Sequence, residues 1–186
     1  MKKFNSYDNV ETYQDIEKLP AGGYIIGILD AEEKEESWGT VLVLKFDIAE
    51  GEFKNYYSNQ YRNSQIENKK YKGVYRMNIP KEDGSEQDVW TARRFKTDIA
   101  AVELSNDGFH WDWDEKKLVG KLVGAVFFEK EYEFNSKTGM FTALHSLKNA
   151  EAIRTGKFKV PEPKMLKKAA ANVFEDLPID DGDLPF

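Results

Sequence analysis

Apolar and polar residues alternate along several stretches of the chain, which is the pattern of β-strands that bury one face. The clearest case is Trp38 to Ile48, where every second residue from Leu42 onward is apolar. Gly22 to Leu29, rich in Ile and Tyr, predicts an earlier strand. Leu118 to Phe134 predicts a later one, which Met140 to Leu147 joins as a hairpin.

Between these strands the pattern indicates a further strand and two helices. Phe53 to Tyr61 is expected to pair back on the preceding strand, because Ala49 to Glu52 is a short connection with glycine at a turn position. Around Trp90 to Asn106 apolar residues recur every three to four positions, which predicts a helix. Asn149 to Thr155 predicts a short second helix that begins at an asparagine cap.

Five strands with a helix after the third is the order of the OB-fold, a small Greek-key barrel that binds oligonucleotides. We therefore predict a mainly β chain with minor α content, built as an OB-fold-like five-stranded barrel with a helix between strands 3 and 4. This domain is expected over 21–160, after an N-terminal arm over 1–20. A linker over 161–174, with partial helical character, leads to a disordered acidic tail over 175–186. Another barrel or sandwich fits the same strands.

Length and composition suit one domain plus appendages, since the chain has 186 residues of which 40% are hydrophobic. There is no cysteine, so neither disulfides nor thiolate metal sites are expected. No stretch reads as a signal peptide or a membrane span. His110 and His145 lie too far apart to form a metal-ligand spacing, and we expect no cofactor. A cytoplasmic location in a bacterial host is expected.

The segment from Lys54 to Arg76 combines six basic residues with five tyrosines and a single acid, Glu67, which gives a local charge of +5. Cations neutralise phosphates, and flat rings stack on unpaired bases, so this mixture favours single-stranded nucleic acid. The alternative is that Tyr56 and Tyr75 are half-buried strand residues and the lysines keep a loop soluble. The predicted contacts from this segment are Lys54, Tyr56, Tyr57, Tyr61, Arg62, Lys69, Lys70, Tyr71, Lys72, Tyr75 and Arg76.

Three further cations, Arg93, Arg94 and Lys96, are expected in the first turn of the long helix. The helix dipole does not favour positive charge at that end. Their position therefore predicts contacts to an outside anion, and we add them to the predicted DNA-binding residues.

The chain ends in twelve residues that hold five carboxylates and no basic residue, and the pattern Asp-Leu-Pro-apolar occurs twice in them. A stretch this acidic cannot bury enough apolar surface to fold alone. Apolar anchors among acids favour a docking peptide, whose partner has a small apolar pocket ringed by Arg or Lys. The alternative is a tail that only confers solubility. The predicted partner-binding residues are Asp180, Asp181, Asp183, Leu184, Pro185 and Phe186.

The tip Asp-Asp-Gly-Asp-Leu-Pro-Phe resembles the acidic C-terminal tip of bacterial and phage single-stranded DNA-binding proteins, with Gly182 among the acids and Leu184 where Ile is usual. Residues 20 to 163, including Gly22 to Ile26 and Phe46 to Phe53, also look like small replication or recombination domains encoded by phages of Gram-positive bacteria. The resemblance implies a protein that coats single-stranded DNA. Its tip would recruit a helicase, primase, polymerase or recombinase, and homo-oligomers are compatible with it.

The net charge of −6 supports a different class of function. The tail contributes −5, the linker +2 and residues 1–160 the remaining −3, so phosphate binding has to come from a local patch. An acidic interaction protein, such as a DNA mimic that occupies a host enzyme's basic cleft, is the alternative. An enzyme ranks third, because the contiguous carboxylates in Trp111 to Glu115 have no evident companions.

Overall fold

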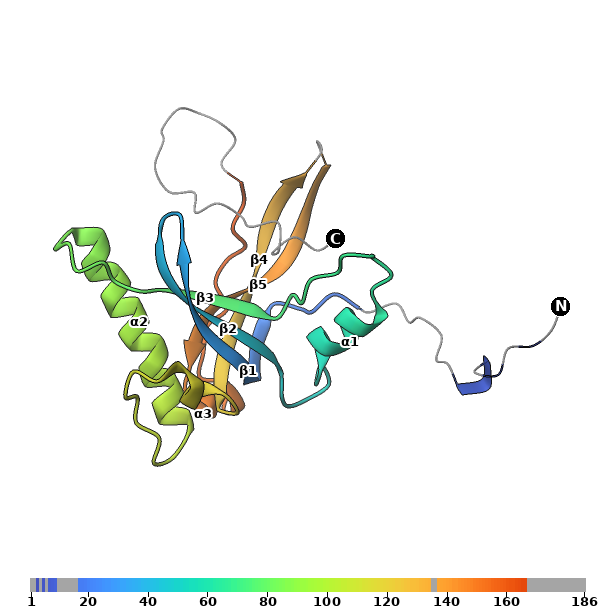
Figure 1. The fold of residues 1–186 in the computed structure, drawn as a ribbon, viewed down its shortest axis with the longest axis horizontal. Coiled ribbons are helices and arrows are strands. Elements are labelled where there is room, and N and C mark those ends of the chain that lie inside the picture. Colours follow the sequence, from blue (N-terminus) through green and yellow to red (C-terminus); the bar gives the residue numbers. More distant parts are fainter. Residues whose placement is uncertain (1–2, 4, 6, 10–16, 135–136, 167–186) are drawn as a thin grey trace.

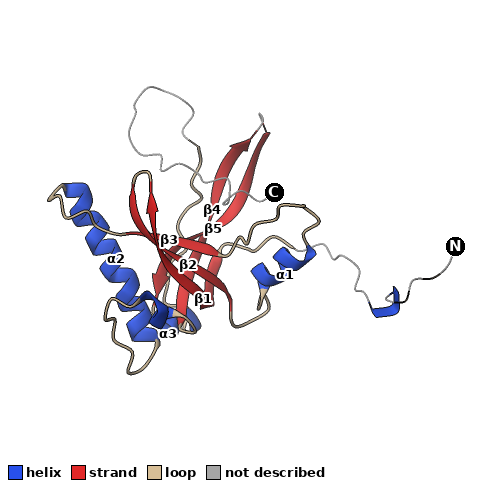
Figure 2. Cartoon of the chain, viewed as in Figure 1, coloured by secondary structure: helices blue, strands red, loops and turns tan. Residues whose placement is uncertain are grey.

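The structure, a computed structural model, describes residues 3, 5, 7–9, 17–134 and 137–166. Within these residues five strands form one antiparallel sheet in the order β3-β2-β1-β4-β5 (Figures 1 and 2). The strands are β1 (Gly22–Glu36), β2 (Gly39–Ile48), β3 (Val74–Asn78), β4 (Leu122–Phe134) and β5 (Lys137–Lys148). The helices are α1 (Tyr56–Asn63), α2 (Glu86–Ser105) and α3 (Ala150–Arg154), with short 3-10 turns η1 (Tyr7–Asn9) and η2 (Glu115–Leu118). The mainly β prediction is confirmed.

Strand β1 is shared by the two halves of the sheet. Its first part, Gly22 to Gly27, pairs with β4, and its part from Ile26 to Glu36 pairs with β2. The register with β2 shifts at Leu29, which lies in a bulge and is 52% exposed although it is apolar. Because β1 changes partners along its length, the β1–β2 and β4–β5 hairpins separate into two arms that rise on either side of a gap (Figure 1).

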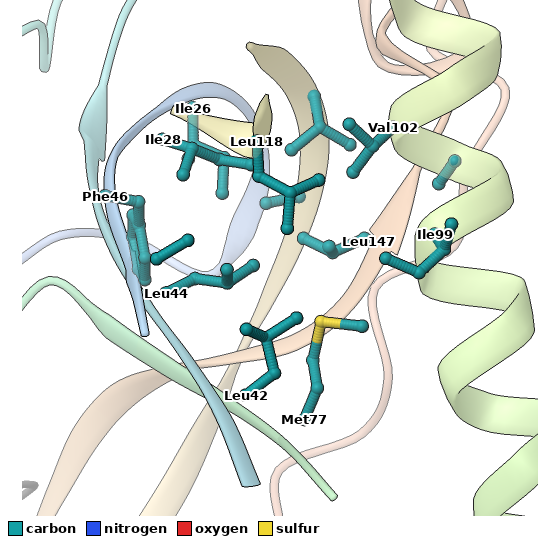
Figure 3. Close-up of a cluster of buried hydrophobic side chains, with 14 of the residues drawn as sticks. Ile26, Ile28, Leu42, Leu44, Phe46, Met77, Ile99, Val102, Leu118 and Leu147 are labelled. Carbon is teal, nitrogen blue, oxygen red and sulfur yellow. The ribbon is translucent and has the colours of Figure 1, made fainter. Parts of the chain in front are cut away.

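The core lies where these arms meet α2. Leu42, Leu44, Phe46 and Ile48 are all buried, as the alternation predicts. The helical stripe is also confirmed, since Ile99 and Val102 of α2 point toward Leu147 and Met77 (Figure 3). Full burial of each such side chain contributes roughly 1.5–3 kcal/mol. This packing holds α2 against the strands at both edges of the sheet, β3 and β5.

The strand predicted over Phe53 to Tyr61 is wrong, because Tyr56–Asn63 forms helix α1. The cause lies at the end of β2, where the buried carboxylate of Asp47 accepts the backbone N–H groups of Tyr57 and Ser58, both at 2.9 Å. These are N–H groups of the first helical turn, which have no partner within the helix. Asp47 therefore acts as a cap supplied by a neighbouring strand, which a reading of local sequence does not reveal.

Helix α2 lies between the third and fourth strands, as predicted, although the third strand is β3 at Val74–Asn78, where no strand was expected. The helix begins earlier than expected. Ser85 is its N-cap, and its hydroxyl accepts the N–H of Asp88 at 3.1 Å. Glu86 and Asp88 occupy the first turn, as the helix dipole favours. The prediction that Arg93, Arg94 and Lys96 crowd that turn is therefore wrong, since they lie about two turns into the helix. The prediction of α3 with its Asn149 cap is confirmed.

After α3 the chain returns along β4. β1 pairs with β4 only as far as Phe127, and beyond that point Lys164 takes its place beside Lys130. The Lys164 N–H donates to Glu129 O and the Lys164 carbonyl accepts from Glu131 N, both at 2.9 Å. The first part of the predicted linker thus packs on the sheet, whereas the acidic tail over 175–186 lies outside the described residues. No helix in the described ranges is long and apolar enough to cross a membrane.

Candidate functional site

A groove of about 650 Å³ opens between the two arms of the sheet. One wall consists of β2, β3 and α1, and the other consists of β4, β5 and the segments that enter and leave the domain. Side chains from the first wall include Trp38, Tyr56, Tyr57, Lys72, Tyr75 and Arg76. Side chains from the second wall include Lys18, Phe128, Lys130, Tyr132, His145 and Lys164.

The pleat of β4 decides which charges reach the groove. Phe128, Lys130 and Tyr132 line it, whereas the intervening Glu129 and Glu131 do not. Successive side chains of a strand point to opposite faces, so a segment with alternating acids and bases becomes cationic on one side. Among the described residues that line the groove, five are Lys or Arg and none carries a carboxylate.

Aromatic side chains accompany these cations on both walls. Trp38 lies in the turn between β1 and β2 and is 38% exposed. On the opposite wall the ring of Phe128 packs edge-on against His145, with 5.2 Å between centroids. Lys130 Nζ lies 6.0 Å from the centroid of Phe141. Rings and cations that share one trough can bind a flexible polyanion with flat bases.

The entry segment joins the two walls at the side of the groove. The N–H of the buried Leu19 donates to Tyr56 Oη on α1 at 3.1 Å, and its carbonyl accepts from Thr142 Oγ1 on β5 at 2.5 Å. Lys18 Nζ pairs with Glu129 at 2.7 Å. The chain before β1 is thereby part of the site.

The structure brings some of the predicted binding residues together and leaves others outside the lining. Those that line the groove are Tyr56, Tyr57, Lys72, Tyr75 and Arg76. Those that do not are Lys54, Tyr61, Arg62, Lys69, Lys70, Tyr71, Arg93, Arg94 and Lys96. Lys69 and Tyr61 form their own contact, with Nζ 4.9 Å from the ring centroid. The predicted partner-binding residues 180–186 lie outside the described residues.

The tyrosines of this segment are packed more tightly than nucleic-acid contacts require. Tyr57 is only 7% exposed and lies edge-on to Phe46, with 5.3 Å between centroids. The hydroxyl of Tyr71 donates to Phe46 O at 3.0 Å, and burial raises the pKa of Tyr71 to about 12. Burial also raises the pKa of Tyr75, whose hydroxyl is bound to Asp98 at 2.7 Å. The alternative interpretation, that Tyr56 and Tyr75 are half-buried strand residues, fits Tyr75 of β3, whereas Tyr56 is half-buried in helix α1.

Sequence reasoning missed Trp38 on the first wall and most of the second wall. The second-wall residues concerned are Lys18, Phe128, Lys130, Tyr132, His145 and Lys164. The alternation of Phe128, Lys130 and Tyr132 against glutamates is visible in the sequence. It identifies one face of a strand, but it does not show that this face meets β3 across a groove.

The carboxylates after α2 serve local structure. Asp112 pairs with Lys117, which lowers the pKa of Asp112, and Asp114 accepts the N–H of Lys116 at 3.1 Å. Trp113, between them, is 78% exposed and stacks on Phe95. In the portions of the chain that the structure describes, no three His, Asp or Glu side chains converge on a position that could hold a metal ion.

Neither a model of a known protein family nor a curated protein matches this sequence. The chemistry of the groove is therefore the basis for a functional inference.

Proposed function

We propose that this protein binds single-stranded DNA with little sequence preference and that the strand lies in the groove between the two arms. The observation that carries the proposal is the combination, among the described lining residues, of five cations and several aromatic rings with no carboxylate. A chain with a net charge of −6 has gathered positive charge in one place. Phosphates would meet the cations, and the rings would stack on bases of any identity at about 1–3 kcal/mol each.

We further propose that the sheet is an OB-fold barrel open between β3 and β5. The order β3-β2-β1-β4-β5, a β1 strand shared by both halves, and a helix between β3 and β4 all support this assignment. In OB-folds, oligonucleotides bind across strands two and three and the loops β1–β2 and β4–β5. In this assignment Trp38 belongs to the β1–β2 loop, and Phe128, Lys130 and Tyr132 lie on β4 near its connection to β5.

In this proposal the protein coats exposed single strands during replication or recombination in a bacterial host cell infected by phage. The acidic tip, Asp180 to Phe186, would recruit a helicase, primase, polymerase or recombinase. Its support is the resemblance of Asp-Asp-Gly-Asp-Leu-Pro-Phe to the tips of single-stranded DNA-binding proteins. Apolar anchors flanked by acids suit a small pocket ringed by basic residues.

Titration of a labelled oligothymidine, followed by fluorescence anisotropy at several salt concentrations, tests the main proposal. With about five phosphates neutralised, the log–log slope of affinity against salt should be about −3.5. A duplex of the same length is the control and should bind more weakly. A flat salt response, or preference for the duplex, would contradict the proposal.

Deletion of Asp180 to Phe186 tests the role of the tip. Because the deletion removes acids and leaves the groove intact, we expect oligothymidine binding to be preserved or tighter while capture of a replication enzyme is lost. Equal capture by the truncated and full chains would refute this role.

A DNA mimic remains the second candidate, and one observation favours it. The outer part of β1 presents four exposed or half-exposed glutamates, Glu32, Glu33, Glu35 and Glu36, along an arm that pairs only with β2 in the described sheet. A gel shift with unlabelled oligothymidine separates the two functions, since a mimic would not bind it.

A further inference from the structure

Strands β3 and β5 form the two edges of the sheet, and residues of both line the groove. No backbone ladder joins them within the described sheet, because the strand order ends with β3 on one side and β5 on the other. A hydrogen-bonded ladder would hold neighbouring strands 4.7–4.9 Å apart. The width of the groove therefore has to be set by something other than strand pairing.

Helix α2 carries a polar pair that reaches both edges. Asp98, which is 1% exposed, accepts from Tyr75 Oη on β3 at 2.7 Å and from the N–H of Leu147 on β5 at 3.3 Å. Arg94 Nε donates to the same carboxylate at 3.1 Å. Arg94 Nη2 donates to Tyr75 Oη at 3.0 Å and also to the carbonyl of His145. One carboxylate and one guanidinium thus connect β3 to β5.

Because Asp98 is buried, loss of any of these hydrogen bonds costs free energy. A carboxylate taken out of water is stabilised only while its hydrogen bonds are kept, and loss of one partner leaves an uncompensated buried charge. The apolar contacts of Ile99 and Val102, beside this pair on α2, press the same helix onto the core (Figure 3). α2 therefore holds the polar pair in one position relative to both strands.

We propose that Arg94 and Asp98 form a latch that sets the separation of β3 and β5, and hence the width of the DNA-binding groove. The inference depends on the proposed function for its consequence but not for its geometry. Arg94 is then a positioning residue and not a phosphate contact, contrary to what the sequence alone predicts. Tyr75 and His145, which the latch holds, line opposite walls of the groove.

The Asp98→Asn substitution distinguishes a latch from a purely electrostatic effect of Asp98 on DNA affinity. Removal of a negative charge beside a cationic groove should tighten DNA binding by charge alone. A latch predicts the reverse: oligothymidine affinity falls about tenfold or more, because the amide cannot hold Arg94, Tyr75 and Leu147 together. The salt slope should stay unchanged, because no phosphate contact is lost, whereas loss of a phosphate contact would reduce it by about 1.

Arg94→Lys keeps the positive charge but not the planar fork that reaches three partners. A latch predicts the same loss of affinity as for Asp98→Asn, whereas a phosphate contact predicts near-normal binding. Arg154→Lys makes the same exchange at an exposed arginine of α3 outside the groove lining; it is the matched control and should bind normally. Tyr75→Phe removes only the bridging hydroxyl and provides a milder variant if Asp98→Asn does not fold, as judged by circular dichroism.

A distance measurement tests the latch without DNA. Because the chain has no cysteine, Asn78→Cys on β3 and Lys148→Cys on β5 can be spin-labelled uniquely, and both positions are exposed. Double electron–electron resonance should give a narrow distance distribution that broadens or lengthens in the Arg94→Lys, Tyr75→Phe and Asp98→Asn backgrounds. Unchanged distances in every folded variant, or tighter DNA binding by Asp98→Asn, would overturn the latch. Failure of the unmodified chain to bind oligothymidine would instead overturn the proposed function, and the distances would still decide the latch.

Discussion

The two walls of the groove are similar in chemistry and different in origin. The wall of α1 and β3 comes from one continuous segment, in which Tyr56, Lys72 and Arg76 lie within about twenty residues of one another. The opposite wall draws Lys18, Lys130 and Lys164 from widely separated parts of the chain. A composition scan detects the first kind of surface, whereas only folding produces the second.

The net charge of a sequence segment is a poor guide to the charge of the surface to which it contributes. The segment from Glu129 to Glu133 contains three glutamates and one lysine, so it reads as acidic. Strand pleating turns Lys130 and Tyr132 into the groove. Glu129 is held by Lys18, and Glu131 accepts the N–H of Leu166 at 2.9 Å. Conversely, the segment with the obvious basic cluster leaves several of its cations outside the lining.

Charge reversal on both walls should have the largest effect. Arg76→Glu combined with Lys130→Glu places two anions in a groove whose described lining holds no carboxylate, and we expect oligothymidine affinity to fall about 100-fold or more. Anisotropy titration at fixed salt measures it. Arg93→Glu with Lys96→Glu reverses two exposed cations outside the lining and serves as the control. A larger loss in the control would place the binding surface on α2 instead.

Removal of the Asp47 carboxylate, which caps α1 from strand β2, should destabilise the first wall of the groove. Asp47→Ala leaves the N–H groups of Ile48, Tyr57 and Ser58 without their acceptor, and we expect the free energy of unfolding to fall by about 3 kcal/mol. Urea denaturation measures this loss. Asp30→Ala, which removes the exposed pair with Lys45 and one side-chain acceptor for the N–H of Ala31, should cost less, about 1 kcal/mol. Equal costs would mean that Asp47 does not hold α1 in place.

Loss of the ring at the tip of the β1–β2 arm should reduce affinity more modestly. Trp38→Ala removes one stacking surface, worth about 1–3 kcal/mol, which corresponds to roughly a 5- to 150-fold loss of oligothymidine affinity. Trp113→Ala removes a more exposed tryptophan outside the groove and should bind as the unmodified chain does. A larger loss of oligothymidine affinity for Trp113→Ala than for Trp38→Ala would show that bases stack outside the two walls.

The smallest effect concerns His145 on the second wall. Burial and the nearby Arg94 lower the pKa of His145 below its ordinary value of 6.5. As pH falls below about 6.5 the unfolded chain therefore binds a proton more readily than the folded one, and stability decreases. His145→Gln should flatten the dependence of Tm on pH between 5 and 7, measured by calorimetry. An unchanged profile would show that His145 titrates normally.

Much of the fold follows from periodicity, and the exceptions have physical causes. The alternation in 42–48 and the stripe of Ile99 and Val102 predict elements that exist, because burial of one face is a local property of a strand or helix. The pattern predicts a strand where α1 forms, because the cap of α1 comes from Asp47 in the preceding strand. It also predicts too late a start for α2, because the Ser85 cap precedes the first buried residue by several positions.

Local pattern is sufficient to predict most strands of the sheet, a helix before the fourth strand, and a segment rich in tyrosine and lysine. These depend on residues close together in the chain. Long-range packing, in contrast, brings the face of β4 with Lys130 opposite β3 across a groove. It also places Arg94 against Asp98 and Tyr75 and outside the groove lining. The reason is that groove walls and buried ion pairs join residues far apart in sequence, and packing, not local pattern, selects those partners.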